Sequence, residues 1–256
     1  YITGSITIDT TLIINSSKTM TINGSEVVVT LTDSASVVLD GTMSAASGAP
    51  GYYLFKDNAA TNFPTSGTIQ GVIKMQADTK NISIPARTYA GRLELLNTGS
   101  TNRIATAGTA SSQTITMGGS QYDTNYAGGL FLAANGTGNI TLEASTYNPT
   151  MTITTYSTAT ATGDLDFIGT GDGSEIINAG SGTWTIKGDI DFTGGTFTKG
   201  SSTVVLNGTG SLQTQTIASA SQSFNNLTIQ NNATNGTIFA DSSTITGTFT
   251  AITASS

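Results

Sequence analysis

Two pairs of aspartates are the residues of this sequence best suited to chemistry. Asp164 and Asp166 are followed 25 residues later by Asp189 and Asp191. Because side chains two residues apart lie on one face of a β-strand, each pair would project together. Four stacked carboxylates could bind Ca²⁺, which prefers oxygen ligands, and two could serve as the acids of a glycoside hydrolase. The simpler interpretation is that these aspartates face outward and keep the chain soluble.

Two residue types that most enzymes depend on are missing. The sequence contains no Cys and no His. Without Cys there are no disulfides, thiolate metal sites or thiol nucleophiles. Without His there is no imidazole ligand and no general base that titrates near neutral pH. We therefore expect no catalytic residues, no enzyme activity, and no cofactor other than the candidate Ca²⁺.

The charge and hydropathy patterns exclude two further classes of partner. The 256 residues carry a net charge of -7, with only nine Lys and Arg, which are scattered along the chain. Nucleic-acid binding needs a clustered basic surface, so we expect none. No run of about 18 apolar residues exists to span a membrane. The sequence begins at Tyr1 rather than Met, which suggests a processed chain and an extracellular or cell-surface location.

The elements that must carry these side chains are strands. Thr is very abundant (49 residues), and Ile and Val recur with it in short alternating runs such as Ile6-Thr7-Ile8. Branching at Cβ suits a pleated surface better than a helix, and alternation with a period of two puts apolar groups on one face. Asn, Gly, Ser or Asp punctuates each run, as at Asn23-Gly24. The sequence predicts an all-β protein.

An internal repeat specifies the architecture further. Residues 163–169 (GDLDFIG) recur as 188–194 (GDIDFTG), and residues 184–186 are echoed by 204–206 and 227–229. Periods of 20 or more residues indicate solenoids, in which each coil buries its apolar side on its neighbour. We predict a parallel β-helix, or β-solenoid, with coils of about 20–25 residues. The alternative is a β-sandwich or jelly roll with a donated N-terminal strand.

Residues 163–256 resemble the degenerate coils of secreted bacterial and archaeal cell-surface proteins. The resemblance lies in the runs GTWTIKGDIDFTGGTFTKGSSTVVLNGTGS and SQSFNNLTIQNNA. The resemblance implies an exported structural or adhesive protein of filament, sheath or adhesin type, and it brings no catalytic residue. We expect one elongated unit over residues 1–256. Within it we distinguish N-terminal strands (1–43), a loop- and aromatic-rich block (44–131) and repeat coils (132–256).

Asparagines followed by X-Ser or X-Thr are more frequent than chance predicts. Such sequons are acceptor sites for N-glycans on surface loops of exported proteins. All four Asn-Gly pairs lie inside sequons, and Asn-Gly is also good turn chemistry, which explains the same positions without glycans. The candidate glycosylation sites are Asn15, Asn23, Asn81, Asn135, Asn139, Asn207, Asn226, Asn232 and Asn235.

The hypothesis for function follows from the ends of a solenoid. A terminal coil exposes unpaired backbone groups and apolar side chains, which a second copy could cover. At the N-terminal end we assign assembly to Tyr1, Ile2, Ile6 and Ile8. We thus expect a structural, self-assembling extracellular protein, a homopolymeric subunit of a filament, sheath or surface layer. The first alternative is an adhesin or carbohydrate-binding module in which a Tyr-rich face of residues 44–131 meets surface glycans, with Tyr52 and Tyr53 as the residues to test. The second is a polysaccharide-degrading β-helix enzyme.

Overall fold

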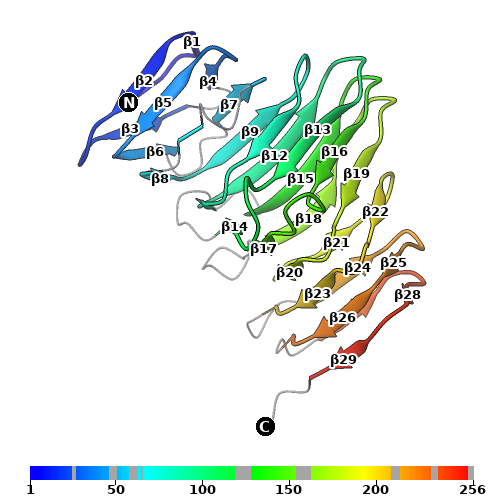
Figure 1. Cartoon of the computed structure of the whole chain (residues 1–256). Coiled ribbons are helices and arrows are strands. Elements are labelled where there is room, and N and C mark those ends of the chain that lie inside the picture. Colours follow the sequence, from blue (N-terminus) through cyan, green and yellow to red (C-terminus); the bar gives the residue numbers. More distant parts are fainter. Residues whose placement is uncertain are drawn as a thin grey trace.

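The computed structural model of the chain is built of β-strands stacked along one axis (Figure 1). It describes residues 1–24, 27–45, 51–57, 63–64, 66–118, 128–153, 163–208, 214–231 and 236–252. These residues form 29 strands and no helix, so none of them lies in a helix that could cross a membrane. The strands follow one another in sequence order from the blue N-terminal end to the red C-terminal end.

The longest sheet receives one strand from every turn of the chain, and all its neighbours are parallel. We call it the long sheet. Its ten strands are β1 (Ile6–Ile8), β4 (Val28–Leu31), β7 (Tyr52–Lys56), β9 (Val72–Gln76), β12 (Arg92–Asn97), β15 (Gly128–Ala134), β18 (Gly163–Phe167), β21 (Ile190–Asp191), β24 (Gln215–Ala218) and β27 (Thr237–Phe239).

A second face of the stack is discontinuous. Its central five-stranded sheet, which we call the middle sheet, is flanked along the chain by two separate strand pairs. The first pair is β2 (Thr11–Ile14) and β5 (Ser36–Leu39). The middle sheet contains β10 (Ile82–Ile84), β13 (Arg103–Ala107), β16 (Ile140–Glu143), β19 (Glu175–Asn178) and β22 (Thr196–Thr198). The last pair is β25 (Ser223–Phe224) and β28 (Thr244–Ile245).

The third face is a three-stranded sheet followed by a seven-stranded one, joined by a single parallel bridge between Gln70 and Ala90. We call it the third sheet. Its strands are β3 (Thr19–Ile22), β6 (Thr42–Ala45), β8 (Thr68–Ile69), β11 (Thr88–Tyr89), β14 (Thr114–Met117), β17 (Thr150–Ile153), β20 (Thr183–Ile186), β23 (Thr203–Leu206), β26 (Asn226–Ile229) and β29 (Phe249–Ala251).

The three faces together make a parallel β-solenoid of ten rungs, which confirms the predicted fold class. The repeat read from the sequence is in register, since Asp166 pairs with Asp191 and Trp184 pairs with Val204. The sandwich alternative is wrong, because every strand pair is parallel, whereas sandwiches and jelly rolls are antiparallel. Rung length varies more than expected, from 20 residues between Ile73 and Leu93 to 37 between Leu93 and Leu130.

The core is the set of inward side chains that stack from rung to rung. Along the long sheet, the one inward row that runs from Val29 through Leu93 to Ile217 is at most 1% exposed. Aromatic rings gather at two places in the core: Phe63 contacts Phe55 and Tyr89 in the N-terminal half, and in the C-terminal half Phe192 and Phe197 stack at 4.6 Å between centroids. Strands from residues 44–131, including β7, β9 and β12, join the same long sheet as strands from the two flanking blocks.

Polar side chains at the corners link each rung to the next. The side-chain carbonyls of Asn81 and Asn135 accept backbone N–H groups from Ile104 and Thr170, one rung later. Such bonds satisfy backbone donors that a turn would otherwise leave unpaired. The rungs also approach closely at glycines: a Cβ on Gly91 would lie 2.1 Å from the carbonyl oxygen of Gly71.

Candidate functional site

The four aspartates predicted to act together lie on β18, on β21 and in the turn before β21, on the outer face of the long sheet. Asp166 and Asp191 are paired neighbours on adjacent strands. Asp164 accepts the N–H of Asp189 at 2.8 Å, and Asp189 accepts the N–H of Thr216 at 2.7 Å. One oxygen of each of these two carboxylates therefore extends the ladder of hydrogen bonds between rungs.

Asp166 is the member of this set with the most perturbed titration. Burial and then the neighbouring carboxylate of Asp191 raise the pKa of Asp166 to about 6, against the attraction of Arg92. Asp191 accepts the N–H of Thr193 at 2.8 Å. In the part of the chain that the structure describes, no three or more acidic side chains form a group suited to a metal ion. Calcium binding here stays a prediction.

Next to the aspartates, the outer face of the long sheet carries a chain of charged and aromatic side chains. The ammonium group of Lys74 lies 4.3 Å from the ring centroid of Tyr52 and 2.8 Å from a carboxylate oxygen of Glu94. The second oxygen of Glu94 lies 2.6 Å from Nε of Arg92. The guanidinium of Arg92 in turn stacks 3.7 Å from the centroid of Phe131.

Within this charged chain, the carboxylate of Glu94 is paired with two cations, Lys74 and Arg92. Glu94 is 5% exposed and lies between two cations, so its negative charge is compensated within the protein. Both carboxylate oxygens of Glu94 are thus engaged by cations, and the pair with Lys74 links β12 to β9. The sequence analysis missed the cluster because its members lie one rung apart, and only the register brings Lys74 opposite Glu94 and Glu94 opposite Phe131.

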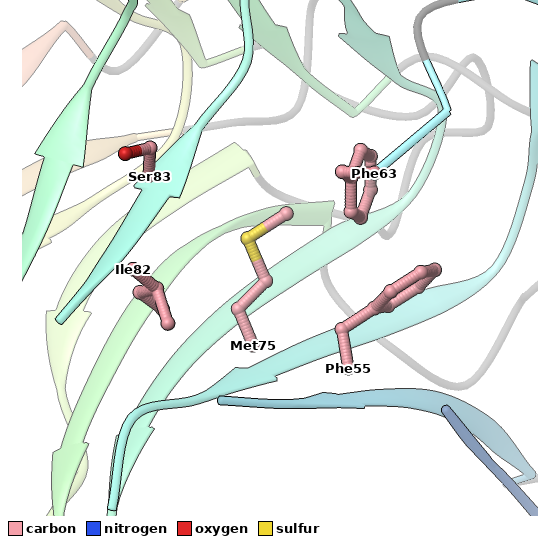
Figure 2. A pocket seen from close by; sticks show the side chains of 5 residues that line it. All are labelled: Phe55, Phe63, Met75, Ile82 and Ser83. Atoms are coloured by element: carbon pink, nitrogen blue, oxygen red, sulfur yellow. The ribbon is translucent and has the colours of Figure 1, made fainter. Parts of the chain in front are cut away.

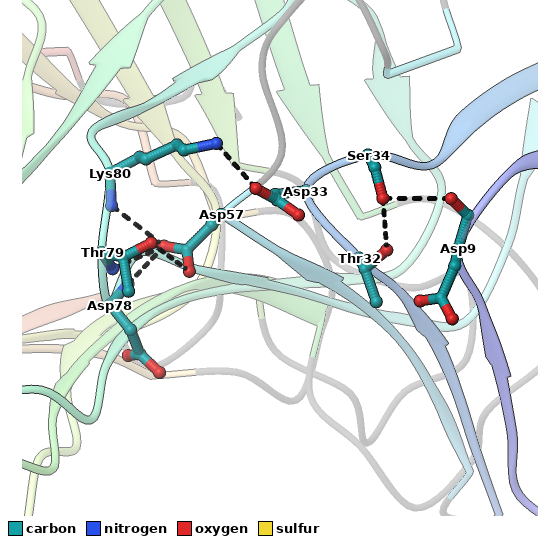
Figure 3. Close-up of polar contacts among 8 residues, drawn as sticks. All are labelled: Asp9, Thr32, Asp33, Ser34, Asp57, Asp78, Thr79 and Lys80. Carbon is teal, nitrogen blue, oxygen red and sulfur yellow. Dashed lines mark hydrogen bonds and ion pairs between the residues drawn. The ribbon is translucent and has the colours of Figure 1, made fainter.

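A second polar cluster occupies the corner after β7 (Figure 3). The carboxylate of Asp57 accepts the N–H groups of Asp78, Thr79 and Lys80 at 2.7, 2.8 and 3.1 Å, and the Thr79 hydroxyl at 2.9 Å. Burial alone would raise the pKa of Asp57, but these donors outweigh it and lower the pKa. Lys80 also forms an ion pair of 2.6 Å with Asp33.

Five side chains on and near β7, β9 and β10 surround a small cavity (Figure 2). A cavity of about 10 Å³ is lined by Phe55, Phe63, Met75, Ile82 and Ser83. That volume holds at most one water molecule, and Ser83 is the one polar residue in the lining. We assign this cavity no ligand.

The candidate glycosylation sites fall into three groups. Asn15, Asn23, Asn81 and Asn135 are exposed, Asn139, Asn207 and Asn226 are half-buried, and Asn232 and Asn235 lie outside the described residues. An N-glycan is attached through the side-chain nitrogen. At Asn226 this nitrogen donates to the Thr203 hydroxyl at 3.2 Å. At Asn81 and Asn135, in the part of the chain that the structure describes, the side-chain oxygen accepts hydrogen bonds and the side-chain nitrogen donates none, which leaves that nitrogen accessible for attachment of a glycan. Glycosylation stays a prediction.

The predicted assembly residues lie on the first rung. Tyr1 is 91% exposed and Ile6 40% exposed, while Ile2 and Ile8 are partly buried against the core. Ile6 occupies an inward position, directly above the buried Val29. The two tyrosines proposed for glycan contact differ: Tyr52 is half-buried beneath Lys74, and Tyr53 is fully buried, with its hydroxyl 2.8 Å from the carbonyl oxygen of Ser44.

The two ends of the solenoid share one feature. On the last rung Phe239 and Phe249 are 38% and 51% exposed, although they continue inward rows whose previous members, Ile217 and Leu227, are fully buried. Both terminal rungs thus present core-type side chains to solvent. Comparison of the chain with protein-family models, with curated proteins and with solved structures gave no significant match.

Proposed function

We propose that this protein is a structural, self-assembling extracellular protein, whose solenoids stack end to end as the subunit of a filament, sheath or surface layer. The observation that supports the proposal is the exposure of inward side chains on the two terminal rungs, Ile6 at one end and Phe239 and Phe249 at the other. Three of the four outer aspartates, Asp164, Asp189 and Asp191, are engaged in bonds between rungs or with their own turn.

Stacking of a second copy would complete the interactions that interior rungs make. Burial of an apolar side chain the size of Ile or Phe contributes about 1.5–3 kcal/mol, so half-exposed Phe239 and Phe249 retain a substantial part of that driving force. Each end also presents the edges of sheets, whose unpaired N–H and C=O groups can extend a parallel ladder. The last rung holds β27, β28 and β29, and the first holds β1, β2 and β3.

The symmetry of such a contact determines its product. The first and last rungs are different surfaces, so their contact is heterologous, and a heterologous contact that does not close into a ring propagates as a fibre. Side chains of Asp, Glu, Lys or Arg are absent from the three strands of each terminal rung. The charged residues of these rungs, Asp9, Lys18 and Asp241, lie in the turns, so salt should act on assembly only through the turns.

The test is assembly of the purified 256-residue chain, followed by sedimentation and electron microscopy. The proposal expects fibres or sheets from the native sequence and loss of assembly in Phe249→Asp, which places a charge in the end contact. Ile238→Asp is the matched control, because Ile238 is 50% exposed on the same rung but projects outward beside the inward Phe239. Native protein that stays monomeric at high concentration would refute end-to-end stacking.

The extracellular part of the proposal needs its own experiment. It rests on the resemblance of residues 163–256 to coils of secreted surface proteins. Labelling of intact source cells with an antibody against the folded solenoid should mark the cell surface. Signal that appears only after permeabilisation would contradict export while leaving the stacking test unaffected.

A further inference from the structure

The outer face of the third sheet carries a file of nearly identical side chains. One outward position per rung is in register along the whole solenoid. Nine of its ten members are threonine and the tenth is valine, which has nearly the same shape. The file consists of Thr19, Thr42, Thr68, Thr88, Thr116, Thr152, Thr185, Val205, Thr228 and Thr250.

A second file runs beside the first across the central rungs. Thr114 pairs with Thr150, and Thr183 pairs with Thr203. The two files form a two-dimensional array on β14, β17, β20 and β23, which we call the threonine face: Thr114, Thr116, Thr150, Thr152, Thr183, Thr185, Thr203 and Val205. All eight residues are exposed or half-buried. Among the described residues, the only hydrogen-bond partner of these hydroxyls is the Asn226 amide at Thr203.

Strand propensity does not account for this uniformity. Thr suits a pleated surface, but that preference acts equally on the outward positions of all three faces. The outward row of the long sheet begins with two threonines and is then mixed: it reads Thr7, Thr30, Leu54, Lys74, Glu94, Phe131, Asp166, Asp191 and Ala218. The outward row of the middle sheet reads Ser83, Thr106, Glu143, Asn178 and Thr198. Only the third sheet repeats one side chain, so its regularity points to a ligand that is itself periodic.

The chemistry of the array limits the classes of ligand that it could bind. It holds no charge for an ionic partner and no aromatic ring, the group that most often lines small-molecule and sugar sites. Each threonine offers a methyl group and a hydroxyl that both donates and accepts. Adjacent strands lie about 4.8 Å apart, and residues two apart along a strand lie about 6.7 Å apart. Oxygen atoms on a prism plane of hexagonal ice repeat in two perpendicular directions at distances of the same order, slightly shorter than the spacing between strands and slightly longer than the spacing along a strand.

We propose that the threonine face binds ice. Its hydroxyls would join the water lattice as donors and acceptors, and water-mediated contacts of this kind are enthalpically nearly as good as direct ones. The methyl groups would sit between rows of lattice water and lose contact with liquid. Because Cβ branching restricts χ1, the array loses little conformational entropy when it meets the lattice. Val205 keeps the methyl group at the one position without a hydroxyl.

The experiment measures thermal hysteresis and the partition of the purified chain into a slowly growing ice hemisphere. The native protein is expected to enter the ice and to produce hysteresis with faceted crystals. Thr152→Tyr, at the centre of the face, should abolish both, because its ring holds the lattice away. Thr141→Tyr is the matched control: Thr141 is a half-buried outward residue on β16 of the same rung, on the middle sheet, and should leave both readouts unchanged.

Circular dichroism melting of each variant separates loss of the face from loss of the fold. Thr152→Val, which removes a hydroxyl and keeps the shape, should retain most of the hysteresis. Exclusion of the folded native protein from ice, or equal loss of hysteresis in Thr141→Tyr, overturns the proposal. Retention on crystalline cellulose or chitin without entry into ice would assign the face to a polysaccharide surface and also overturns it. The outcome is independent of end-to-end assembly, because monomers carry the complete face.

Discussion

The corner aspartate Asp57 provides a sharp test of how the rungs are held together. Asp57 is only 6% exposed, and its carboxylate accepts hydrogen bonds from three backbone N–H groups and one hydroxyl of the next rung. Hydrogen bonds to charged groups contribute about 1.5–3 kcal/mol each, though bonds sharing one acceptor are not additive. We expect Asp57→Ala to reduce the free energy of unfolding by about 3–5 kcal/mol, measured by urea denaturation at pH 7.

Two further substitutions separate the carboxylate from the backbone conformation. Asp57 has a φ of 51°, a region that Asn and Gly adopt at a lower free-energy cost than Ala. Asp57→Asn keeps an acceptor oxygen and loses the charge, so we expect a smaller loss of about 1–2 kcal/mol. Asp57→Gly relieves the backbone and removes every acceptor, so its cost should stay close to that of the Ala variant.

The dependence on pH follows from the lowered pKa of Asp57. A carboxyl whose pKa is lower in the folded state stabilises the protein above its unfolded pKa, near 3.9, and loses that contribution as pH falls through the folded value. The stability difference between the native protein and Asp57→Asn should therefore be largest at neutral pH and shrink below about pH 4.

The control and the refuting result are both specific. Asp40→Ala removes an exposed carboxylate with no side-chain hydrogen bond among the described residues, and it should change stability by less than about 0.5 kcal/mol. Amide hydrogen exchange should lose protection at Asp78, Thr79 and Lys80 in Asp57→Ala. If that variant matches Asp40→Ala in stability and keeps the three amides protected, corner carboxylates do not hold the rungs together.

Three further substitutions test other parts of the solenoid. Burial and the neighbouring Asp191 raise the pKa of Asp166 to about 6, so the charge of Asp166 opposes folding at neutral pH. At pH 7, Asp166→Asn should therefore melt at a higher temperature than the native protein. The difference in melting temperature should close as the pH falls from about 6 to 4. Glu94→Ala leaves two largely buried cations without their partner and should cost about 3–5 kcal/mol in urea denaturation, whereas a change below about 1 kcal/mol would mean the network is solvated. Gly91→Ala should lower the free energy of unfolding by at least about 3 kcal/mol, because the new Cβ would meet backbone atoms that cannot move aside. Gly4→Ala is the control: no atom lies within 4 Å of its Cβ, so urea denaturation should show no change in stability.

Much of the fold was predictable because local pattern and global architecture agree. Alternation in runs such as Ile6-Thr7-Ile8 depends only on the pleat of a strand, and the repeat at 163–169 and 188–194 comes from adjacent rungs of similar length. Those two rungs have short connections, so stacked residues kept a nearly constant spacing. The prediction of a solenoid rested on this part of the chain.

The threonine face escaped the sequence analysis for the opposite reason. Its members Thr116, Thr152 and Thr185 stand 36 and 33 residues apart, while Thr185 and Val205 stand 20 apart. Loops of different length hide a period that exists only in space. The charged chain around Glu94 was missed likewise, because no local motif connects Lys74 with a carboxylate one rung later. In a solenoid the register, which sequence pattern does not give, decides which side chains meet.

The corner asparagines also bear on how the molecule ages. Asn-Gly sequences deamidate when the glycine nitrogen attacks the side-chain carbonyl carbon and closes a succinimide ring. At Asn135 the carbonyl oxygen is held by Thr170, and the N–H of Gly136 donates to the carbonyl oxygen of Asn97 at 3.1 Å. At the Asn207–Gly208 pair the glycine N–H donates to the buried Gln215 side chain. The hydrogen bonds that join rungs thus also restrain the attacking nitrogen. Deamidation at these Asn-Gly pairs should therefore be much slower in the folded solenoid than in the unfolded chain.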